Sequence, residues 1–406
     1  MKIPNAARIL IGLIAGLAGG YLAGSQAAAL PALQTIGGLW LDALRMPIVP
    51  LVFALIVTGL GTTASGGSTR VARRAIGAFI VFLFASAVFG VALGWGMFSS
   101  WQVAGLDALR IDAGKVPSLP PLQDSLRALV PVNPIAAAAQ GAIVPVVIFA
   151  LLFAVALRRI EARHAAAIGE FFQGVADALL VIIGWVLLAA PLGVFALAFD
   201  VAARSGLGVG ALLAWYVAAR VIAGIVLMAA FVLLVAVAAR TPLRAFARAA
   251  LPAQSVAFST QSSLASLPAM IEGARALNLP DRQVGTVLPL AVALFRINAP
   301  AAITLAILAL AKLNGVELSL AQLALVVPLS VLNNLVIAGL PNQISFFAAY
   351  APVALAVGVP IELLPLFLAV DTIPDMFATT ANVTADLAVT TLLTERGGDD
   401  EPADDA

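Results

Sequence analysis

The sequence predicts an all-α polytopic membrane protein with eight transmembrane helices and two re-entrant helical hairpins. Of its 406 residues, 62% are hydrophobic and 11% are charged, whereas about 25% of residues are charged in soluble domains. Mean hydropathy is +1.07. Apolar runs recur from Ile9 to Leu393 with short polar breaks, and many approach the roughly 20 residues that cross a bilayer. We therefore expect one continuous transmembrane domain over residues 1–395.

Several functional classes are disfavoured by residue types that are scarce or missing. Cysteine is absent and His164 is the single histidine, so a disulfide framework, a thiolate metal site and a cysteine nucleophile are excluded. The net charge of +1 gives no indication of nucleic-acid binding. A membrane enzyme is disfavoured because the sequence has no Ser/His pair at helical spacing, metal-ligand cluster or phosphate-binding Gly loop. We expect no organic cofactor.

Six apolar runs precede residue 240, and the basic residues outside them predict the orientation. The runs cover residues 7–25, 36–64, 75–98, 134–157, 170–199 and 209–238. Basic clusters follow zero, two, four and six crossings: Lys2 and Arg8; Arg70, Arg73 and Arg74; Arg158, Arg159 and Arg163; Arg240, Arg244 and Arg248. Because basic loops face the cytoplasm, both termini of an eight-span chain are expected there. The acidic tail 396–406 is expected to be disordered.

Two segments after residue 248 have the pattern of interrupted helices. The segment 251–270 carries seven polar side chains between short apolar arms: Ser255, Ser259, Thr260, Gln261, Ser262, Ser263 and Ser266. The segment 329–350 has Asn333 and Asn334 in one arm and a Gly339–Gln343 tip. Non-helical backbone persists at membrane depth only where protein or a water-filled cavity satisfies it, so paired hairpins indicate a solute site. We expect hairpins at 246–277 and 320–352; the alternative is two amphipathic helices on the membrane surface.

Each hairpin precedes a span with ionisable groups. Arg296 lies four residues before Pro300, which can interrupt a helix and free backbone carbonyls. Four polar residues of the last span fall within about 60° of one another on a helical wheel: Asp371, Asp375, Asn382 and Asp386. Carboxylates inside a membrane are costly to bury and are functional candidates by default. The hairpins and this polar stripe together predict a secondary transporter of a small polar solute.

The last span resembles that of a known transporter family. Its DMFATTANVTADL run (375–387) follows the Asp-Met-Gly-Arg-Thr-x-x-Asn-Val-Thr-Gly-Asp pattern of the dicarboxylate/amino acid:cation symporters, which have the glutamate-transporter fold. Three spans and both hairpin tips are also similar, at 46–60, 133–157, 190–197, 262–268 and 338–343. The resemblance implies a homotrimer of elevator-type protomers gated by the second hairpin. Its scaffold would cover about 7–64 and 134–199, and its mobile transport part about 75–98 and 209–394.

The resemblance also implies site residues. It assigns Asp375 to the substrate ammonium, and Asn382 with the Ser262 and Ser263 tip to the substrate carboxylate. Other positions expected to contact substrate are Arg296, Gly339, Pro341 and Thr379. Asn382 and Asp386 are expected to contribute to a site for a coupling cation, H⁺ or Na⁺.

The chain departs from the family pattern at the positions that recognise the substrate side chain and at those that bind sodium. The family's last-span arginine is Ala378 here, and the first-hairpin arginine of some members is Gln261. The family's seventh-span Asn-Met-Asp-Gly-Thr aligns with Phe-Arg-Ile-Asn-Ala at 295–299. Two oxygen ligands are therefore lost and a fixed cation is gained. Because a hard cation needs several oxygen donors, ordinary three-sodium coupling is not expected.

Three roles for Arg296 remain open from the sequence. Its guanidinium could clamp a substrate carboxylate in place of the missing arginine. It could instead pair with Asp386 or Asp371 as a built-in cation, so that coupling is to protons or absent. It could also do no more than satisfy carbonyls freed near Pro300.

The sequence thus predicts an inner-membrane symporter, embedded in the lipid bilayer, for a small anionic amino acid or dicarboxylate. One alternative is a neutral amino acid carrier or exchanger with weak or no sodium coupling, which the loss of the last-span arginine favours. An alternative of another class is a solute-gated channel or a sensor that has lost transport.

Overall fold

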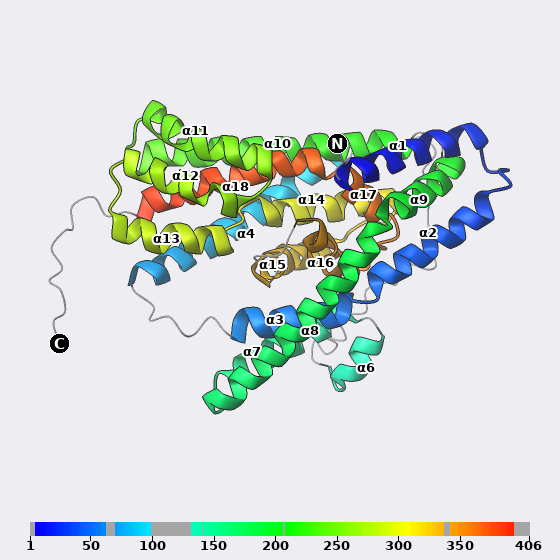
Figure 1. The fold of residues 1–406 in the computed structure, drawn as a ribbon, viewed down its shortest axis with the longest axis horizontal. Coiled ribbons are helices and arrows are strands. Elements are labelled where there is room, and N and C mark those ends of the chain that lie inside the picture. Colours follow the sequence, from blue (N-terminus) through cyan, green and yellow to red (C-terminus); the bar gives the residue numbers. More distant parts are fainter. Residues whose placement is uncertain are drawn as a thin grey trace. The chain divides into compact units, whose positions relative to one another are not determined.

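The computed structural model describes residues 5–61, 70–98, 131–140, 142–205, 208–336 and 342–393. Within these ranges the regular elements are helical and no strand occurs (Figure 1). The all-α polytopic class is therefore confirmed. The tail 396–406 lies outside the described residues, as do Gly339 and Pro341 at the expected tip of the second hairpin.

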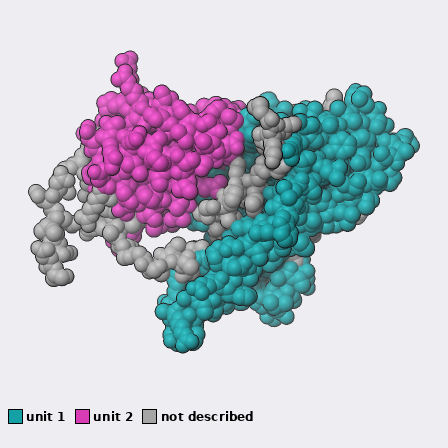
Figure 2. All heavy atoms as spheres, in the orientation of Figure 1, with its two compact units in different colours: residues 1–67, 87–220, 299–374 teal, residues 68–86, 221–298, 375–406 magenta. Residues whose placement is uncertain are grey.

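The chain forms two compact units (Figure 2). Unit 1 comprises residues 1–67, 87–220 and 299–374, and unit 2 comprises residues 68–86, 221–298 and 375–406. The boundary between the units passes through or beside four helices: α4 (Arg70–Phe98), α10 (Gly208–Ala238), α14 (Asn298–Leu313) and α18 (Thr372–Leu393). The division into a scaffold and a transport part, which uses other ranges, stays a prediction.

Five helical stretches within the described residues are long and apolar enough to cross a membrane. They are Leu30–Thr58, Arg73–Phe98, Ala162–Leu188, Gly208–Ala238 and Gln283–Leu313. Shorter apolar helices cover Ala7–Ala23, Pro145–Leu157, Leu320–Leu335 and Phe346–Ala356. These lengths and compositions make the chain a multi-pass membrane protein, while the count of eight spans stays a prediction.

Three of the predicted spans are each divided into two helices near a proline. The helices are α2 (Leu30–Arg45) and α3 (Ile48–Gly61), α6 (Pro134–Ala139) and α7 (Ile143–Leu157), and α8 (Ala162–Leu188) and α9 (Ala190–Ser205). Proline lacks an N–H and its ring clashes with the carbonyl four residues earlier, so it breaks a helix interior and suits a first turn. Pro47 directly precedes α3, and Pro145 and Pro191 lie in the first turns of α7 and α9. Hydropathy alone does not reveal such breaks.

In unit 1, α1 (Asn5–Ala23) packs closely along α9 (Figure 1). Gly12, Gly16 and Gly20 recur every four residues on the contact face, and a Cβ atom on any of them would collide with a backbone carbonyl oxygen of α9. Those oxygens belong to Pro191, Phe195 and Phe199. Small residues at this spacing let two membrane helices approach to backbone contact, where van der Waals packing holds them together.

The segment of the second predicted hairpin contains α15 (Leu320–Val336) and α16 (Asn342–Ala356), which pack against each other; the re-entrant hairpin itself stays a prediction. Pro352 lies inside α16 and leaves the carbonyl of Ala348 without its usual helical donor. The Asn333 side chain of α15 donates from Nδ2 to the oxygens of Ala348 at 2.8 Å and Ala349 at 2.7 Å. The arms are therefore joined by a hydrogen bond that the proline makes available.

Unit 2 contains the first hairpin, formed by α11 (Leu243–Thr260) and α12 (Ser263–Ala276), followed by α13 (Asp281–Leu294). The two hairpin arms lie side by side (Figure 1), and Gly273 of α12 approaches the backbone oxygen of Ala249 in α11. Pro252 and Pro268 lie inside the arms on exposed faces. The re-entrant position of this hairpin, predicted at 246–277, stays a prediction.

Candidate functional site

The tip of the first hairpin turns at Gln261 and restarts at Ser262. Gln261 has a left-handed backbone conformation with φ of 54°, which ends α11. Ser262 is extended and accepts a hydrogen bond at its hydroxyl from the Ala265 N–H at 3.2 Å, so it is the N-cap of α12. Ser263 is the first helical residue. The tip thus presents two hydroxyl side chains at a helix N-terminus, where unpaired N–H groups and the helix dipole favour an anion.

The last helix, α18, buries the polar residues that the sequence singled out. Asp375 is 7% exposed, Asp386 is 1% exposed, and Thr379 and Asn382 are also buried. Ala378, at the position of the family's arginine, is buried among them. The predicted polar face of the last span is therefore an interior face of the protein.

The prediction of one continuous helix through Asp371 was wrong. α17 (Leu364–Val370) ends directly before Asp371, which is its C-cap, and α18 begins at Thr372. Pro374 accounts for the break, because its ring would clash with the carbonyl of Val370, four residues earlier. A helical wheel through residues 371–386 therefore does not place Asp371 relative to the other three residues.

Asp371 lies in unit 1, where it pairs with Arg220. The Arg220 Nη1 atom donates to Asp371 Oδ1 at 3.1 Å, to Tyr216 Oη at 2.7 Å and to Tyr350 Oη at 3.0 Å. The residues come from α10, the C-terminal end of α17 and the second arm of the second hairpin. Arg220 is 3% exposed. This buried cluster accounts for Arg220, whose role the sequence does not show.

The seventh span is broken at Arg296, between α13 and α14. The Ile297 N–H donates to the Phe295 carbonyl at 3.0 Å, which forms a three-residue turn centred on Arg296. The Arg296 side chain is half-buried and forms no hydrogen bond or ion pair with another described residue. It does not satisfy carbonyls near Pro300, which was the third role considered for it.

Side chains from two other segments of unit 2 bind the backbone of this break. The Ser86 hydroxyl of α4 donates to the Ile297 carbonyl at 2.5 Å. The Asn298 N–H donates to the side-chain oxygen Oδ1 of Asn382 at 2.9 Å. Asn382, predicted as a substrate and cation ligand, is therefore brought directly to the interrupted helix. This contact joins the two parts of the site that the sequence analysis treated separately.

Several buried polar side-chain atoms of Asn298 and Asp386 have no hydrogen-bond partner among the described residues. Oδ1 and Nδ2 of Asn298 and Oδ1 of Asp386 are buried, and none of them bonds to a described residue. Asn298 is 1% exposed, and Asp386 lies one turn after Asn382 on α18. Such atoms cost about 1–3 kcal/mol each unless water or an ion satisfies them. They mark a place for a polar ligand.

Asn298 is a candidate site residue that the sequence analysis missed. Asn298 was considered only as part of the 295–299 stretch that differs from the family pattern, where it occupies the position of the family's glycine. An amide side chain inside an apolar run, two residues before Pro300, could have identified it, because both features favour unpaired polar groups at membrane depth.

The two positions of the lost sodium ligands are apolar and buried. Phe295 stacks on Phe79 with ring centroids 4.8 Å apart and contacts Phe82 and Phe231. Ile297 is also buried. An aromatic cluster thus anchors one side of the break, and the oxygen donors that the family has there are replaced by hydrocarbon.

Within unit 2, the first arm of the first hairpin, α11, contacts α18 at two points. Gln254 of α11 donates to the Thr384 hydroxyl of α18 at 2.8 Å. Phe258 contacts Phe377 edge-on, with ring centroids 5.5 Å apart. Because the helices run antiparallel between these contacts, the tip at Ser262 is directed towards the level of Asp375. The predicted partners of an ammonium and a carboxylate thus come from neighbouring parts of one unit.

Among the described residues, no group of three or more His, Asp or Glu side chains could hold a metal ion. The candidate ligands for a coupling cation are therefore the carboxylate of Asp386 and the side-chain oxygens of Asn382 and Asn298. One carboxylate and two amides suit a monovalent cation or a proton better than a divalent metal.

Comparison with known proteins identifies the family. Residues 6–396 match the profile of the Sodium:dicarboxylate symporter family. The chain is 27% identical to a proton/sodium-glutamate symport protein of Bacillus subtilis, over 99% of this chain and 95% of the relative. It is 26% identical to a C4-dicarboxylate transport protein of Rhodospirillum rubrum, over 90% of this chain and 82% of the relative. It is also 27% identical to a serine/threonine transporter of Streptococcus agalactiae, over 76% of this chain and 74% of the relative. These relatives are transporters rather than enzymes, and the family match covers nearly the whole chain. The chain therefore belongs to the sodium:dicarboxylate symporter family.

Proposed function

We propose that this chain is a secondary active symporter that moves a small anionic amino acid or dicarboxylate across the inner membrane together with H⁺ or Na⁺. The observation that supports the proposal most strongly is the hydrogen bond from the Asn298 N–H to Asn382. The side-chain amide atoms of Asn298 and the Oδ1 atom of Asp386 are buried and bond to no described residue. The homotrimer and the elevator movement are part of the same proposal and follow from the family resemblance, while the cytoplasmic termini follow from the basic loops.

An amino acid's charged groups have separate partners in unit 2. The buried Asp375 carboxylate suits the ammonium, because a charge-assisted hydrogen bond is strongest away from water. The Ser262 and Ser263 tip, with the N-terminus of α12, suits the main-chain carboxylate, and Thr379 and Asn382 add neutral donors. Gly339 and Pro341 of the second hairpin lie outside the described residues and stay proposed substrate contacts on the family resemblance alone.

Arg296 is proposed to bind a second substrate carboxylate. Its guanidinium is half-buried at a turn and forms no hydrogen bond within the described residues, so its five donors are available. Asp371, one of the two residues considered as its ion-pair partner, is paired with Arg220 instead. The planar guanidinium can bind a carboxylate through two parallel hydrogen bonds. Arg296 would thus replace the family's arginine, whose position is occupied by Ala378 here.

Replacing Arg296 by Met tests this role. We expect Arg296→Met to weaken uptake of aspartate and succinate by at least about tenfold, because a hydrogen bond to a charged group contributes about 1.5–3 kcal/mol. Serine uptake should change little, since serine has no second carboxylate. Arg275→Met is the matched control, because Arg275 forms an exposed ion pair with Asp281. Unchanged selectivity together with a new dependence on sodium would favour the built-in cation and contradict the clamp.

A neutral amino acid carrier is the second candidate within the same class. Ala378 in place of the family's arginine favours it, and the serine/threonine transporter of S. agalactiae is among the relatives. Serine uptake that exceeds aspartate and succinate uptake in the wild-type protein would establish this alternative.

A solute-gated channel or a transport-dead sensor is the candidate of another class. Counterflow separates the classes, because only a carrier transiently accumulates labelled solute when the vesicle is preloaded with unlabelled solute. We expect such an overshoot. Label that only equilibrates would indicate a channel, and no uptake at all would indicate a sensor.

A further inference from the structure

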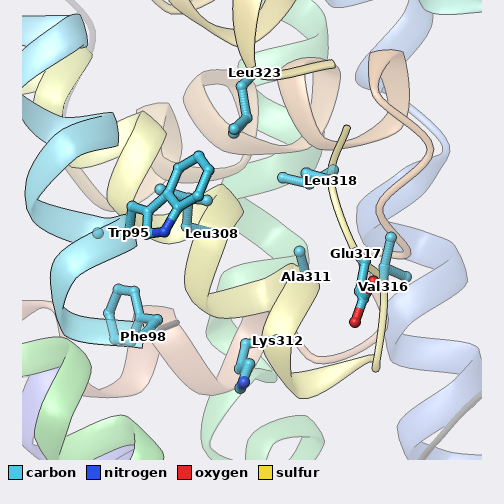
Figure 3. A pocket seen from close by; sticks show the side chains of 10 residues that line it. Trp95, Phe98, Leu308, Ala311, Lys312, Val316, Glu317, Leu318 and Leu323 are labelled. Atoms are coloured by element: carbon cyan, nitrogen blue, oxygen red, sulfur yellow. The ribbon is translucent and has the colours of Figure 1, made fainter. Parts of the chain in front are cut away.

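Unit 1 contains a cavity of about 350 Å³ at the ends of three helices, and none of its lining residues is among those proposed to bind substrate. Its walls come from the last residues of α4, the last turns of α14 and the first turn of α15 (Figure 3). This volume lies at the small end of the range of about 300–1,000 Å³ found for ligand sites. It can hold a headgroup or a short chain segment, but not a whole lipid.

The lining combines hydrocarbon with two opposite charges. Trp95, Phe98, Leu308 and Leu323 are apolar, while Lys312 and Glu317 carry the charges. Figure 3 shows Lys312 and Glu317 towards one side of the cavity and Trp95 and Leu323 towards the other. A ligand that fits this lining has an apolar part and both a negative and a positive group.

The position along the chain indicates the depth in the membrane. Two of the stretches long and apolar enough to span a bilayer, Arg73–Phe98 and Gln283–Leu313, end at residues that line or adjoin the cavity. The ends of apolar spans lie near the boundary between hydrocarbon and water, where tryptophan and lysine are enriched. Trp95 is 53% exposed in the isolated chain, which suits a side chain that lies against lipid. A cavity at the ends of these spans is therefore expected at the level of the phospholipid headgroups.

We propose that this cavity binds the headgroup of a zwitterionic phospholipid with a primary ammonium, such as phosphatidylethanolamine. Lys312 contacts the phosphate, Glu317 contacts the ammonium, and the upper acyl chains lie against Trp95 and Leu323. A primary ammonium donates N–H hydrogen bonds to the Glu317 carboxylate, whereas a quaternary ammonium has no N–H to donate. An anionic lipid without an ammonium would contact Lys312 but make no hydrogen bond to Glu317, whose exposed carboxylate would stay hydrated.

Lipid selectivity of the whole purified protein tests the proposal. Phosphatidylethanolamine, phosphatidylcholine or phosphatidylglycerol would be added to the protein in detergent, and bound lipid would be measured by native mass spectrometry and by the shift in thermal unfolding. We expect phosphatidylethanolamine to bind at least about tenfold more tightly than the other two, because the hydrogen bond to the charged Glu317 carboxylate is made only with the primary ammonium. Equal binding of the three lipids would overturn the proposal, since it would show a general effect of the apolar surface.

Two variants give signatures that a loss of stability alone would not produce. Glu317→Gln should remove the preference for phosphatidylethanolamine over phosphatidylcholine, because the carboxylate that tells them apart is gone. Lys312→Gln should weaken the binding of all three lipids, because each has a phosphate. The matched control is Arg275→Gln with Asp281→Asn, an exposed pair of opposite charges in unit 2. Variants that retain the wild-type selectivity would contradict the assignment. Competition by tail-free phosphoethanolamine as strong as by the lipid would also contradict it, because it would indicate a soluble zwitterion.

Discussion

Asp375→Asn is expected to lower the uptake of a transported amino acid by at least about 100-fold. The substitution keeps the shape of the side chain and removes its charge, so the substrate ammonium loses its partner at a position that is 7% exposed. Loss of one member of a buried charge pair costs about 2–5 kcal/mol, and about 100-fold corresponds to the lower part of that range. The measurement is initial uptake of labelled aspartate into proteoliposomes.

Succinate provides an internal comparison for this variant. Succinate has no ammonium, so Asp375→Asn should not reduce its uptake in the same way and could even aid it by removing a nearby negative charge. Asp281→Asn in the first turn of α13 is a control for the general loss of a carboxylate. Aspartate uptake that survives Asp375→Asn would contradict the assignment of Asp375 to the ammonium.

Arg220→Met is expected to lower the free energy of unfolding by about 3–5 kcal/mol. The substitution leaves the Asp371 carboxylate buried without its cation and removes hydrogen bonds to Tyr216 and Tyr350. The cluster joins α10, the end of α17 and an arm of the second hairpin, so its loss should also loosen that arm. Chemical denaturation in a fixed detergent and proteolysis of the hairpin measure the two effects.

The double variant Arg220→Met with Asp371→Leu separates the broken pair from lost packing. Replacing both charges by apolar side chains leaves no unpaired ion, so we expect the double variant to be more stable than Arg220→Met alone. Removal of the exposed pair at Arg275 should change the free energy of unfolding by less than about 1 kcal/mol. A double variant as unstable as the single one would show that the cluster contributes through shape rather than charge.

Features that depend on residues close together along the chain could be predicted from the sequence. The tip of the first hairpin needs a turn and a helix cap, and the QSS stretch supplies a left-handed residue followed by a serine N-cap. The polar face of α18 repeats at helical spacing, and the family pattern of 375–387 was specific enough to indicate the family before any comparison. Apolar runs likewise located the spans, because burial in lipid requires them.

Features that depend on tertiary contact were not predictable. Spacing does not show that Asn382 binds the backbone of Asn298, because the residues are 84 positions apart and meet only where the seventh span is broken. It also did not show that Asp371 pairs with Arg220. The helical wheel assumed one helix through residues 371–386, whereas Pro374 ends that helix, so the angular argument failed at Asp371.

The coupling ion depends on how many oxygen donors remain beside Asp386. A proton needs only the carboxylate, whereas sodium needs several oxygens, and Asn298 can supply one in place of those lost at Phe295 and Ile297. Asn298→Leu should therefore abolish sodium-driven uptake and leave proton-driven uptake largely intact.

Uptake under imposed ion gradients tests whether this chain couples solute transport to a cation. Labelled aspartate, succinate and serine would be offered to proteoliposomes with an inward sodium gradient, an inward proton gradient or neither, for the wild-type protein and for Asp386→Asn. We expect aspartate or succinate to accumulate above its external concentration under one of the two gradients, and we expect Asp386→Asn to abolish this accumulation. Uptake that reaches the same level without a gradient, and is unchanged in Asp386→Asn, would contradict cation-coupled transport by this chain.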